Sequence, residues 1–269
     1  MTASTPVVCL VGWGAIASAV GRILMERGTG ARIAAVVVRN PEALRSPLPR
    51  DVRILTDTAA LAGTECNLVV EAAGRAAAAQ WGAAALGTGL DFVMGSPSAL
   101  ADPEIAARID TEQRRGGGRL IVPAGSLGGI GAIASASRLP LSDVLHEIAK
   151  PPRAWMGTPA ETHADLNRLA GPQVVFDGTA RDAARLYPAN ANSVVVTALA
   201  GIGLDRTRVR LVADPGLTRN EHRLQAHGDF GHWTMSLANA PLDDNPKSSA
   251  MTALNLVRVI ENRCVGMIL

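Results

Sequence analysis

The chain has 269 residues, of which 48% are hydrophobic and 19% are charged. This composition supplies a hydrophobic core and excludes a disordered chain. The formal net charge is only +2, without a stripe of basic and aromatic residues, so we expect no nucleic-acid partner. The length is suited to a nucleotide domain with a smaller second domain.

The cysteines and the N-terminus indicate the compartment. Cys9, Cys66 and Cys264 lie far apart without CxxC spacing, so we expect neither a metal site nor a disulfide framework. The N-terminus has no basic n-region, and no apolar run approaches the roughly 18 residues of a membrane span. We therefore expect a cytoplasmic protein with no membrane contact.

The first half of the chain alternates between strand and helix patterns. The β-branched run Val7–Val11 ends at Gly12, and apolar residues then recur at helical spacing. Further strands are predicted at Ile33–Val38, Asn67–Ala72, Asp91–Met94 and Leu120–Val122, with an Ala-rich helix between the middle two. This alternation predicts an α/β fold with a Rossmann-type, doubly wound parallel sheet.

The second half has a different pattern, with strands separated by short polar turns. These strands are predicted at Leu145–Ala149, Val174–Asp177, Val209–Ala213, His222–His227 and Trp233–Leu237. Together with a helix at Ser193–Ala200, they predict a smaller α/β domain with a mixed or antiparallel sheet. We expect a dinucleotide-binding domain at residues 1–128 and a substrate and dimerisation domain at 129–240. Helical periodicity over 245–262 predicts that residues 241–269 return to the nucleotide domain.

The turn after the first strand has the GxGxxA pattern of a dinucleotide site. Gly12, Gly14, Ala15 and Ile16 lie between a strand and an amphipathic helix, which is the context that this motif requires. The helix N-terminus then offers unpaired N–H groups to phosphates. The alternative is a glycine-rich turn without a ligand.

The end of the second strand bears on the choice of cofactor. An Asp or Glu there would bind the ribose 2′-OH, but residues 38–40 read Val-Arg-Asn. We expect Arg39 to pair with a 2′-phosphate or lie across the adenine, so NADP is tolerated. The alternative is an exposed arginine at a strand end.

His222 and Asn190 are candidate groups of the second half. Strand alternation places His222 on the same face as Leu224 and Ala226, which suits either a core histidine or a proton-transfer group near a cofactor cleft. Asn190 precedes an apolar helix, where it would cap the helix or bind a ligand amide.

Residues 245–249, Asn-Pro-Lys-Ser-Ser, are expected to open the last helix. Asn245 would be its N-cap and Pro246 its first helical residue. Lys247, Ser248 and Ser249 would then form a carboxylate site in the first turn. The alternative is an ordinary capped helix.

Several segments together resemble the L-aspartate dehydrogenase family over almost the whole chain. They are GxGxxA, EAAG at 71–74, PAGSLGG at 123–129, KPP and GTPAE at 150–161, PANAN at 188–192, NEHR at 220–223, HGDFG at 227–231 and NPKSS at 245–249. The resemblance implies oxidation of L-aspartate to iminoaspartate with NAD or NADP, and supply of nicotinamide-cofactor biosynthesis. It also implies a second α/β domain, and we expect a homodimer.

The resemblance also implies roles for individual residues. The family's catalytic histidine falls on His222, and its nicotinamide contacts fall on Ala124 and Asn190; we add Ala73 and Gly74 of EAAG as cofactor contacts. The sequence departs from the family in PAGSLGG and in NPKSS, where NPKTS is usual, which leaves substrate preference open. A dehydrogenase or imine reductase for another small amino or oxo acid, and a non-catalytic NADP sensor, remain alternatives.

Overall fold

The computed structural model describes residues 5–44, 46–242 and 245–264, without the side chains of Ala43, Pro246 and Lys247. The chain forms two compact units. Unit 1 comprises residues 1–125 and 242–269, and unit 2 comprises residues 126–241. The first break precedes the expected one after residue 128, because Leu127 packs with Leu224 in the core of unit 2.

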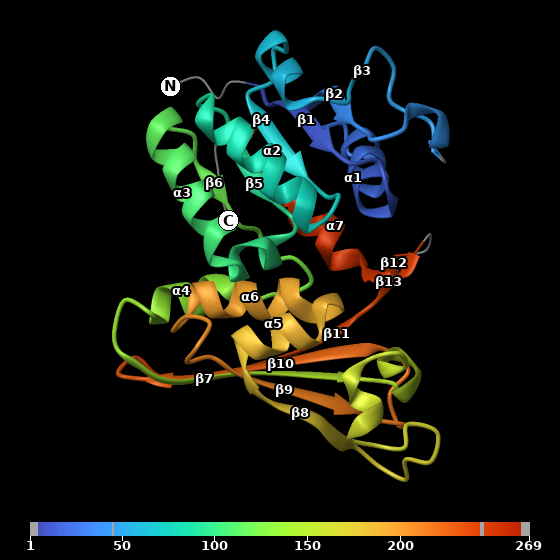
Figure 1. The fold of residues 1–269 in the computed structure, drawn as a ribbon, viewed down its shortest axis with the longest axis vertical. Coiled ribbons are helices and arrows are strands. Elements are labelled where there is room, and N and C mark those ends of the chain that lie inside the picture. Colours follow the sequence, from blue (N-terminus) through green and yellow to red (C-terminus); the bar gives the residue numbers. More distant parts are fainter. Residues whose placement is uncertain (1–4, 45, 243–244, 265–269) are drawn as a thin grey trace. The chain divides into compact units, whose positions relative to one another are not determined.

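The described part of unit 1 contains a six-stranded parallel sheet with the order β3-β2-β1-β4-β5-β6 (Figure 1). Its strands are β1 (Val7–Val11), β2 (Arg32–Val37), β3 (Arg53–Leu55), β4 (Leu68–Glu71), β5 (Asp91–Met94) and β6 (Leu120–Ile121). The order reverses between β1 and β4, so the loops after these two strands lie at the switch point where such sheets bind ligands. The Rossmann-type, doubly wound sheet is confirmed.

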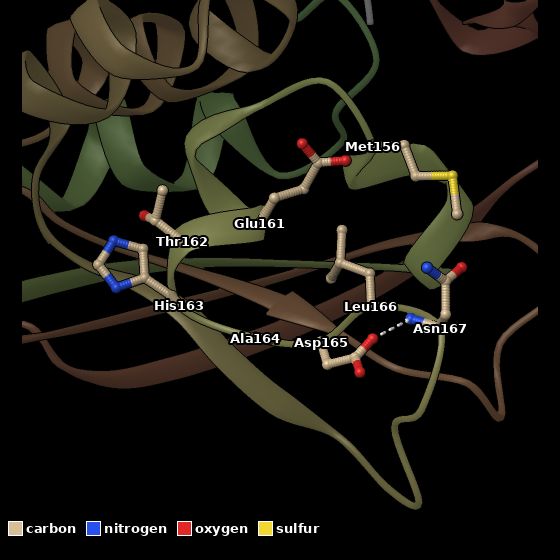
Figure 2. A pocket seen from close by; sticks show the side chains of 8 residues that line it. All are labelled: Met156, Glu161, Thr162, His163, Ala164, Asp165, Leu166 and Asn167. Carbon is tan, nitrogen blue, oxygen red and sulfur yellow. Dashed lines mark hydrogen bonds between the residues drawn. The ribbon is translucent and has the colours of Figure 1, made fainter.

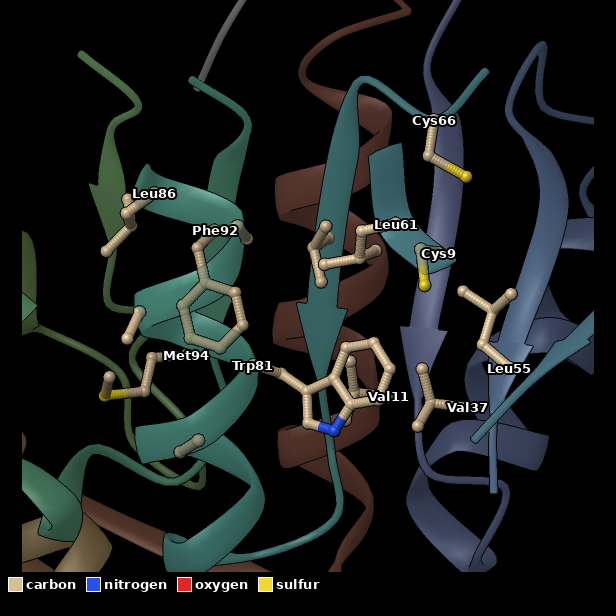
Figure 3. Close-up of a cluster of buried hydrophobic side chains, with 14 of the residues drawn as sticks. Cys9, Val11, Val37, Leu55, Leu61, Cys66, Trp81, Leu86, Phe92 and Met94 are labelled. Carbon is tan, nitrogen blue, oxygen red and sulfur yellow. The ribbon is translucent and has the colours of Figure 1, made fainter. Parts of the chain in front are cut away.

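Helices cover both faces of this sheet. They are α1 (Ala15–Glu26), α2 (Arg75–Gly87), α3 (Pro103–Gly116) and α7 (Ala250–Glu261). Cys9 and Val11 of β1 face α2, where Trp81 and Phe92 fill the interior (Figure 3). Alternate residues of β1 pack with α1 and α7 on the opposite face. Because both faces are buried, these strands read as continuous apolar runs.

The predicted start of the last helix was wrong. Residues 245–249 form β13 (Asn245–Ser249), which pairs with β12 (Pro241–Leu242), and α7 begins only at Ala250. Ser249 is the N-cap, because its side chain accepts a hydrogen bond from the Met251 N–H at 3.2 Å. Asn245 and Pro246 are therefore not the cap and first residue of the helix. The helix packs within unit 1, as its apolar periodicity predicts.

Unit 2 contains a five-stranded mixed sheet with the order β11-β10-β7-β9-β8. Its strands are β7 (Leu141–Lys150), β8 (Gln173–Thr179), β9 (Arg208–Ala213), β10 (Asn220–Gly228) and β11 (Gly231–Asn239), and its helices are α4 (Ile130–Ala136), α5 (Ala180–Leu186) and α6 (Ala191–Ala200). Strands β7 and β9 pair in parallel, whereas β10 with β11, β10 with β7, and β8 with β9 pair antiparallel. The helices lie on one side of this sheet in Figure 1, which confirms the expected second α/β domain.

Several short or polar elements do not appear in the sequence-based prediction. They are β3, α3, α4 and α5, and the 3-10 turns Pro41–Ala43, Thr58–Gly63, Pro97–Ala101, Pro152–Trp155, Pro159–Thr162 and Pro188–Asn190. Helix α3 is rich in charged residues and buries mainly Ile109. The sequence does contain signals of its two ends, since Asp102 caps its N-terminus, Pro103 is its first residue and Gly117 follows its last turn in the left-handed conformation.

Candidate active site

The turn between β1 and α1 is shaped for a close ligand. Gly12 has φ +95°, and a Cβ there would lie 2.8 Å from the Cβ of Ala73, so only glycine fits. Gly14 is the N-cap of α1, where no side chain caps the helix and no acidic residue lies in the first turn. The N–H groups of Ala15 and Ile16 therefore remain available to an anion such as a pyrophosphate. These features fit a pyridine dinucleotide.

The loop after β4 is held by a buried carboxylate. Glu71 is 0% exposed, and its Oε1 accepts hydrogen bonds from the N–H groups of Ala73 at 2.6 Å and Gly74 at 2.7 Å. Ser96 donates its hydroxyl to Oε1 at 2.9 Å and its N–H to Oε2 at 2.8 Å. Burial raises the pKa of Glu71, whereas these four donors favour its charged form. The backbone of Ala73 and Gly74 is thus fixed beside Gly12.

The loop after β2 contains the expected discriminator of the two cofactors. Arg39 is exposed and forms no hydrogen bond or ion pair with a described residue. Asn40 accepts a hydrogen bond from the Glu42 N–H at 3.0 Å, so its side chain is used in the turn. Residues 38–40 therefore present no carboxylate that would repel a 2′-phosphate.

His222 lies in β10 with its side chain 6% exposed, on the same buried face as Leu224 and Ala226. The alternation predicted from the sequence is therefore confirmed. Its Nδ1 lies 3.0 Å from Nε2 of His146 in the neighbouring strand β7, and His146 is fully buried. Burial is the largest cause that lowers the pKa of both imidazoles, to about 4 for His222. His222 is thus neutral near pH 7 and able to accept a proton.

Lys150 is a further ionisable group of this cluster, and it is half-buried. Its Nζ donates a hydrogen bond to Oδ1 of Asn190 and lies 5.2 Å from the ring centroid of Trp155. Burial lowers the pKa of Lys150 to about 8, and its charge contributes, after burial, to the low pKa of His222. Asn190 occupies the N-cap position of α6 but makes no side-chain cap there. Its side chain instead binds Lys150.

Sequence reasoning missed His146, Lys150 and Glu71 as site residues. The alternation of β7 would have placed His146, Ile148 and Lys150 on one face, but nothing local shows that β7 pairs with β10. The register that brings His146 to His222 exists only in the folded sheet.

Ala124 and the segment 247–249 were the remaining residues expected in the site. Ala124 is half-buried after β6, and the adjacent carbonyl of Gly125 accepts a hydrogen bond from Asn255 at 2.8 Å. Ser248 accepts one from Asn245 at 3.1 Å, and the Ser249 hydroxyl caps α7. Lys247 belongs to β13, but its side chain lies outside the described residues.

A surface cavity of about 590 Å³ in unit 2 contains none of the expected residues. It is lined by a loop with Glu161, His163 and Asp165, and Oδ1 of Asp165 accepts the Asn167 N–H at 3.2 Å (Figure 2). Across the described residues, no group of three or more His, Cys, Asp or Glu side chains is arranged to hold a metal ion. None of the described helices combines the length and apolar character needed to cross a membrane.

Two family models together match most of the chain. Residues 131–263 match the family model "Aspartate dehydrogenase, C-terminal", and residues 12–123 match "Homoserine dehydrogenase, NAD binding domain". The L-aspartate dehydrogenase of Brucella anthropi is 50% identical over 95% of this chain and 96% of its own length. That of Pseudomonas aeruginosa is 40% identical with the same coverage.

Solved structures show the same fold. The aspartate dehydrogenase of Thermotoga maritima superposes with a TM-score of 0.76 at 22% identity, covering 98% of this chain and 99% of its own. A hyperthermophilic archaeal homoserine dehydrogenase in complex with NADPH superposes with a TM-score of 0.62 at 10% identity, covering 96% and 97%. Because half of the aligned residues are identical to the Brucella anthropi enzyme over 95% of this chain and 96% of that one, the chain belongs to the L-aspartate dehydrogenase family.

Proposed function

We propose that this protein oxidises L-aspartate to iminoaspartate with NAD or NADP, and catalyses the reverse reductive amination of oxaloacetate. The observation that carries the proposal is that His222 is buried, neutral and in hydrogen-bond contact with His146. The same chain has a glycine turn that fits a dinucleotide. The names of its relatives supply the substrate.

The proposal assigns cofactor binding mainly to unit 1. The backbone of Gly12, Gly14, Ala15 and Ile16 would hold the pyrophosphate, and Ala73, Gly74 and Ala124 would line the rest of the site. Arg39 would bind a 2′-phosphate, and Asn190 would bind the nicotinamide end. When bound, the nicotinamide accepts the hydride that leaves the α-carbon.

The proton is assigned to His222. As the C=N bond forms, the substrate nitrogen loses a proton, which Nε2 of neutral His222 accepts. The alternative role of His222 is to orient the water that later hydrolyses the imine. Neutral imidazole is the form that the first role needs, and burial keeps His222 in that form.

The substrate carboxylates are assigned to the segment around Lys247. Charge-assisted bonds from Lys247, with Ser248 and Ser249, would orient the α-hydrogen. Lys247→Ala should then raise the KM for L-aspartate and leave cofactor affinity unchanged, with a loss of about 1.5 to 3 kcal/mol for a hydrogen bond to a charged group. An unchanged KM would remove Lys247 from the site.

The test of the function is the absorbance of reduced cofactor with L-aspartate, a panel of other amino acids, and NAD or NADP. We expect L-aspartate to have the highest kcat/KM. His222→Ala should retain the fold and cofactor binding while turnover falls by roughly 10² to 10⁴. A higher kcat/KM with another amino acid would contradict L-aspartate as the substrate. Cofactor binding without turnover of any amino acid would indicate a sensor protein.

Three further features belong to the proposal. The working unit is a homodimer, which analytical ultracentrifugation of the purified protein tests. The protein acts in the cytoplasm, which its free cysteines Cys9, Cys66 and Cys264 suit. Its product supplies nicotinamide-cofactor biosynthesis.

A further inference from the structure

In unit 2, His222 is the end of a row of four hydrogen-bonding groups, which are the Ser193 carbonyl, the Thr197 hydroxyl and the rings of His146 and His222. The carbonyl of Ser193 lies 3.2 Å from Oγ1 of Thr197, which lies 3.0 Å from Nδ1 of His146. Nε2 of His146 in turn lies 3.0 Å from Nδ1 of His222. Thr197 and His146 are fully buried, so water is excluded as a substitute partner for either.

The row begins at a group that can only accept. The Ser193 carbonyl already accepts the backbone N–H of Thr197 within α6, and it has no proton to donate, so the 3.2 Å contact is a further hydrogen bond only when the Thr197 hydroxyl donates its single proton to it. Oγ1 of Thr197 is then the acceptor in its contact with His146, so Nδ1 of His146 must carry the ring proton and donate it. Burial keeps His146 neutral, so its Nε2 has no proton and accepts. Nδ1 of His222 must therefore donate.

The opposite order has a cost. If the hydroxyl proton pointed to His146, the Ser193 carbonyl would keep only its helical N–H, and the side chains of the row would form two hydrogen bonds in place of three. His222 would then carry its proton on Nε2 and could not accept another there. A buried row favours the order that forms the larger number of hydrogen bonds, which is the first one.

We infer that His146, anchored by Thr197, is a positioning residue that holds His222 in the tautomer with its proton on Nδ1 and a free lone pair on Nε2. No described residue forms a hydrogen bond with Nε2 of His222, so that lone pair is available to a substrate. In a neutral histidine, the hydrogen bond made by one ring nitrogen decides whether the other ring nitrogen carries a proton. The catalytic consequence rests on the proposed function of His222.

The row also ends inside the protein. Beyond Thr197 it reaches only a backbone carbonyl, so it provides no path by which a proton leaves the site. Because His146 is a neutral acceptor and not a carboxylate, it orients His222 without strongly raising its pKa. Lys150, the charged group that acts on His222, lowers that pKa further.

The tautomer is measurable in the free protein, without substrate or cofactor. Nitrogen NMR of ¹⁵N-histidine-labelled protein distinguishes protonated from bare ring nitrogens, and the spectrum of His222→Gln identifies the His222 signals. We expect a protonated Nδ1 and a bare Nε2 for His222 at pH 7. A proton on Nε2 in the wild-type protein would overturn the inference.

Two pairs of variants test the cause. His146→Leu removes the acceptor, whereas His146→Gln offers an amide oxygen to His222 and an N–H to Thr197. Thr197→Val removes the anchor at nearly constant shape, whereas Thr197→Ser retains the hydroxyl. We expect Leu and Val to give mixed His222 tautomers, and Gln and Ser to retain the wild-type form. Unchanged tautomers in both His146→Leu and Thr197→Val would overturn the inference.

Kinetics separate this inference from the proposed function. His146→Leu should lower kcat by roughly 10-fold to 100-fold with little change in KM, less than removal of the base itself. His146→Gln should restore most of that loss. If His222→Ala turned over normally, the proposed function would fail and the catalytic part of this inference with it. If His222→Ala were inactive but His146→Leu had wild-type kcat, only the positioning role would be refuted.

Discussion

Nζ of Lys150 donates a hydrogen bond to Oδ1 of Asn190, which joins the end of β7 to the turn before α6. The same cation lies 5.2 Å from the ring centroid of Trp155 and lowers the pKa of His222. With its own pKa lowered to about 8 by burial, Lys150 is mostly charged at pH 7. It therefore opposes protonation of the histidine while it holds Asn190.

Replacing this cation should change the pH dependence of the enzyme. Lys150→Met removes a positive charge near His222, so the pKa of His222 rises from about 4. With His222 as the proposed base, its neutral form is the active one, so the acidic limb of the kcat/KM profile should move to higher pH. Lys150→Arg retains the charge and serves as the control. Identical acidic limbs in the wild type and Lys150→Met would show that Lys150 does not act on His222.

Folding stability should fall in mild acid. An unfolded histidine has the ordinary pKa of 6.5 whereas folded His222 has about 4, so between these values the unfolded chain binds the extra proton. The contribution of His222 to the free energy of unfolding is therefore complete above pH 6.5 and is lost as the pH falls toward 4. Below pH 4 this group causes no further change. The loss is about 3 kcal/mol at most for His222.

Urea unfolding at several pH values would measure this loss. His146, whose pKa is lowered well below 6.5 by burial, adds to it in the same direction. His222→Gln should flatten the dependence between pH 6.5 and 4. A variant with the wild-type slope would show that His222 titrates normally in the fold.

The two glycines of the first turn should respond differently to alanine. At Gly14 a Cβ meets no protein atom within 4 Å and φ is −84°, so Gly14→Ala should retain the melting temperature. If a pyrophosphate approaches this backbone, cofactor affinity should nevertheless fall at least tenfold. Gly12→Ala, with φ +95° and the close contact to Ala73, should also lose stability, by about 1 to 3 kcal/mol. Normal cofactor binding by Gly14→Ala would place the dinucleotide elsewhere.

Cofactor selectivity should depend on Arg39. Arg39→Asp exchanges a phosphate partner for a repelling charge, so it should weaken NADP by roughly 10-fold to 100-fold and NAD far less. Arg39→Gln, which removes the charge without reversing it, should have an intermediate effect. Fluorescence titration with both reduced cofactors measures the ratio, and equal losses would make Arg39 a surface residue.

Local patterns were sufficient for much of the fold. The Val7–Val11 run and the glycines after it predict β1 and the start of α1, because strand propensity and backbone freedom act over a few neighbouring residues. The period-2 alternation around His222 likewise predicts its buried face. The start of α7 was not predictable in this way.

What the sequence by itself determined is the order of strands and helices, the glycine turn of the cofactor site and the candidate histidine, since each depends on residues close together in the chain. Only the tertiary structure decided what surrounds them. His146 and His222 are 76 positions apart and meet through the register of β7 against β10, and Glu71 and Ser96 meet across β4 and β5. Hydrogen bonds and burial of this kind depend on distances in space, which no local pattern contains, and burial together with the charge of Lys150 lowers the pKa of His222.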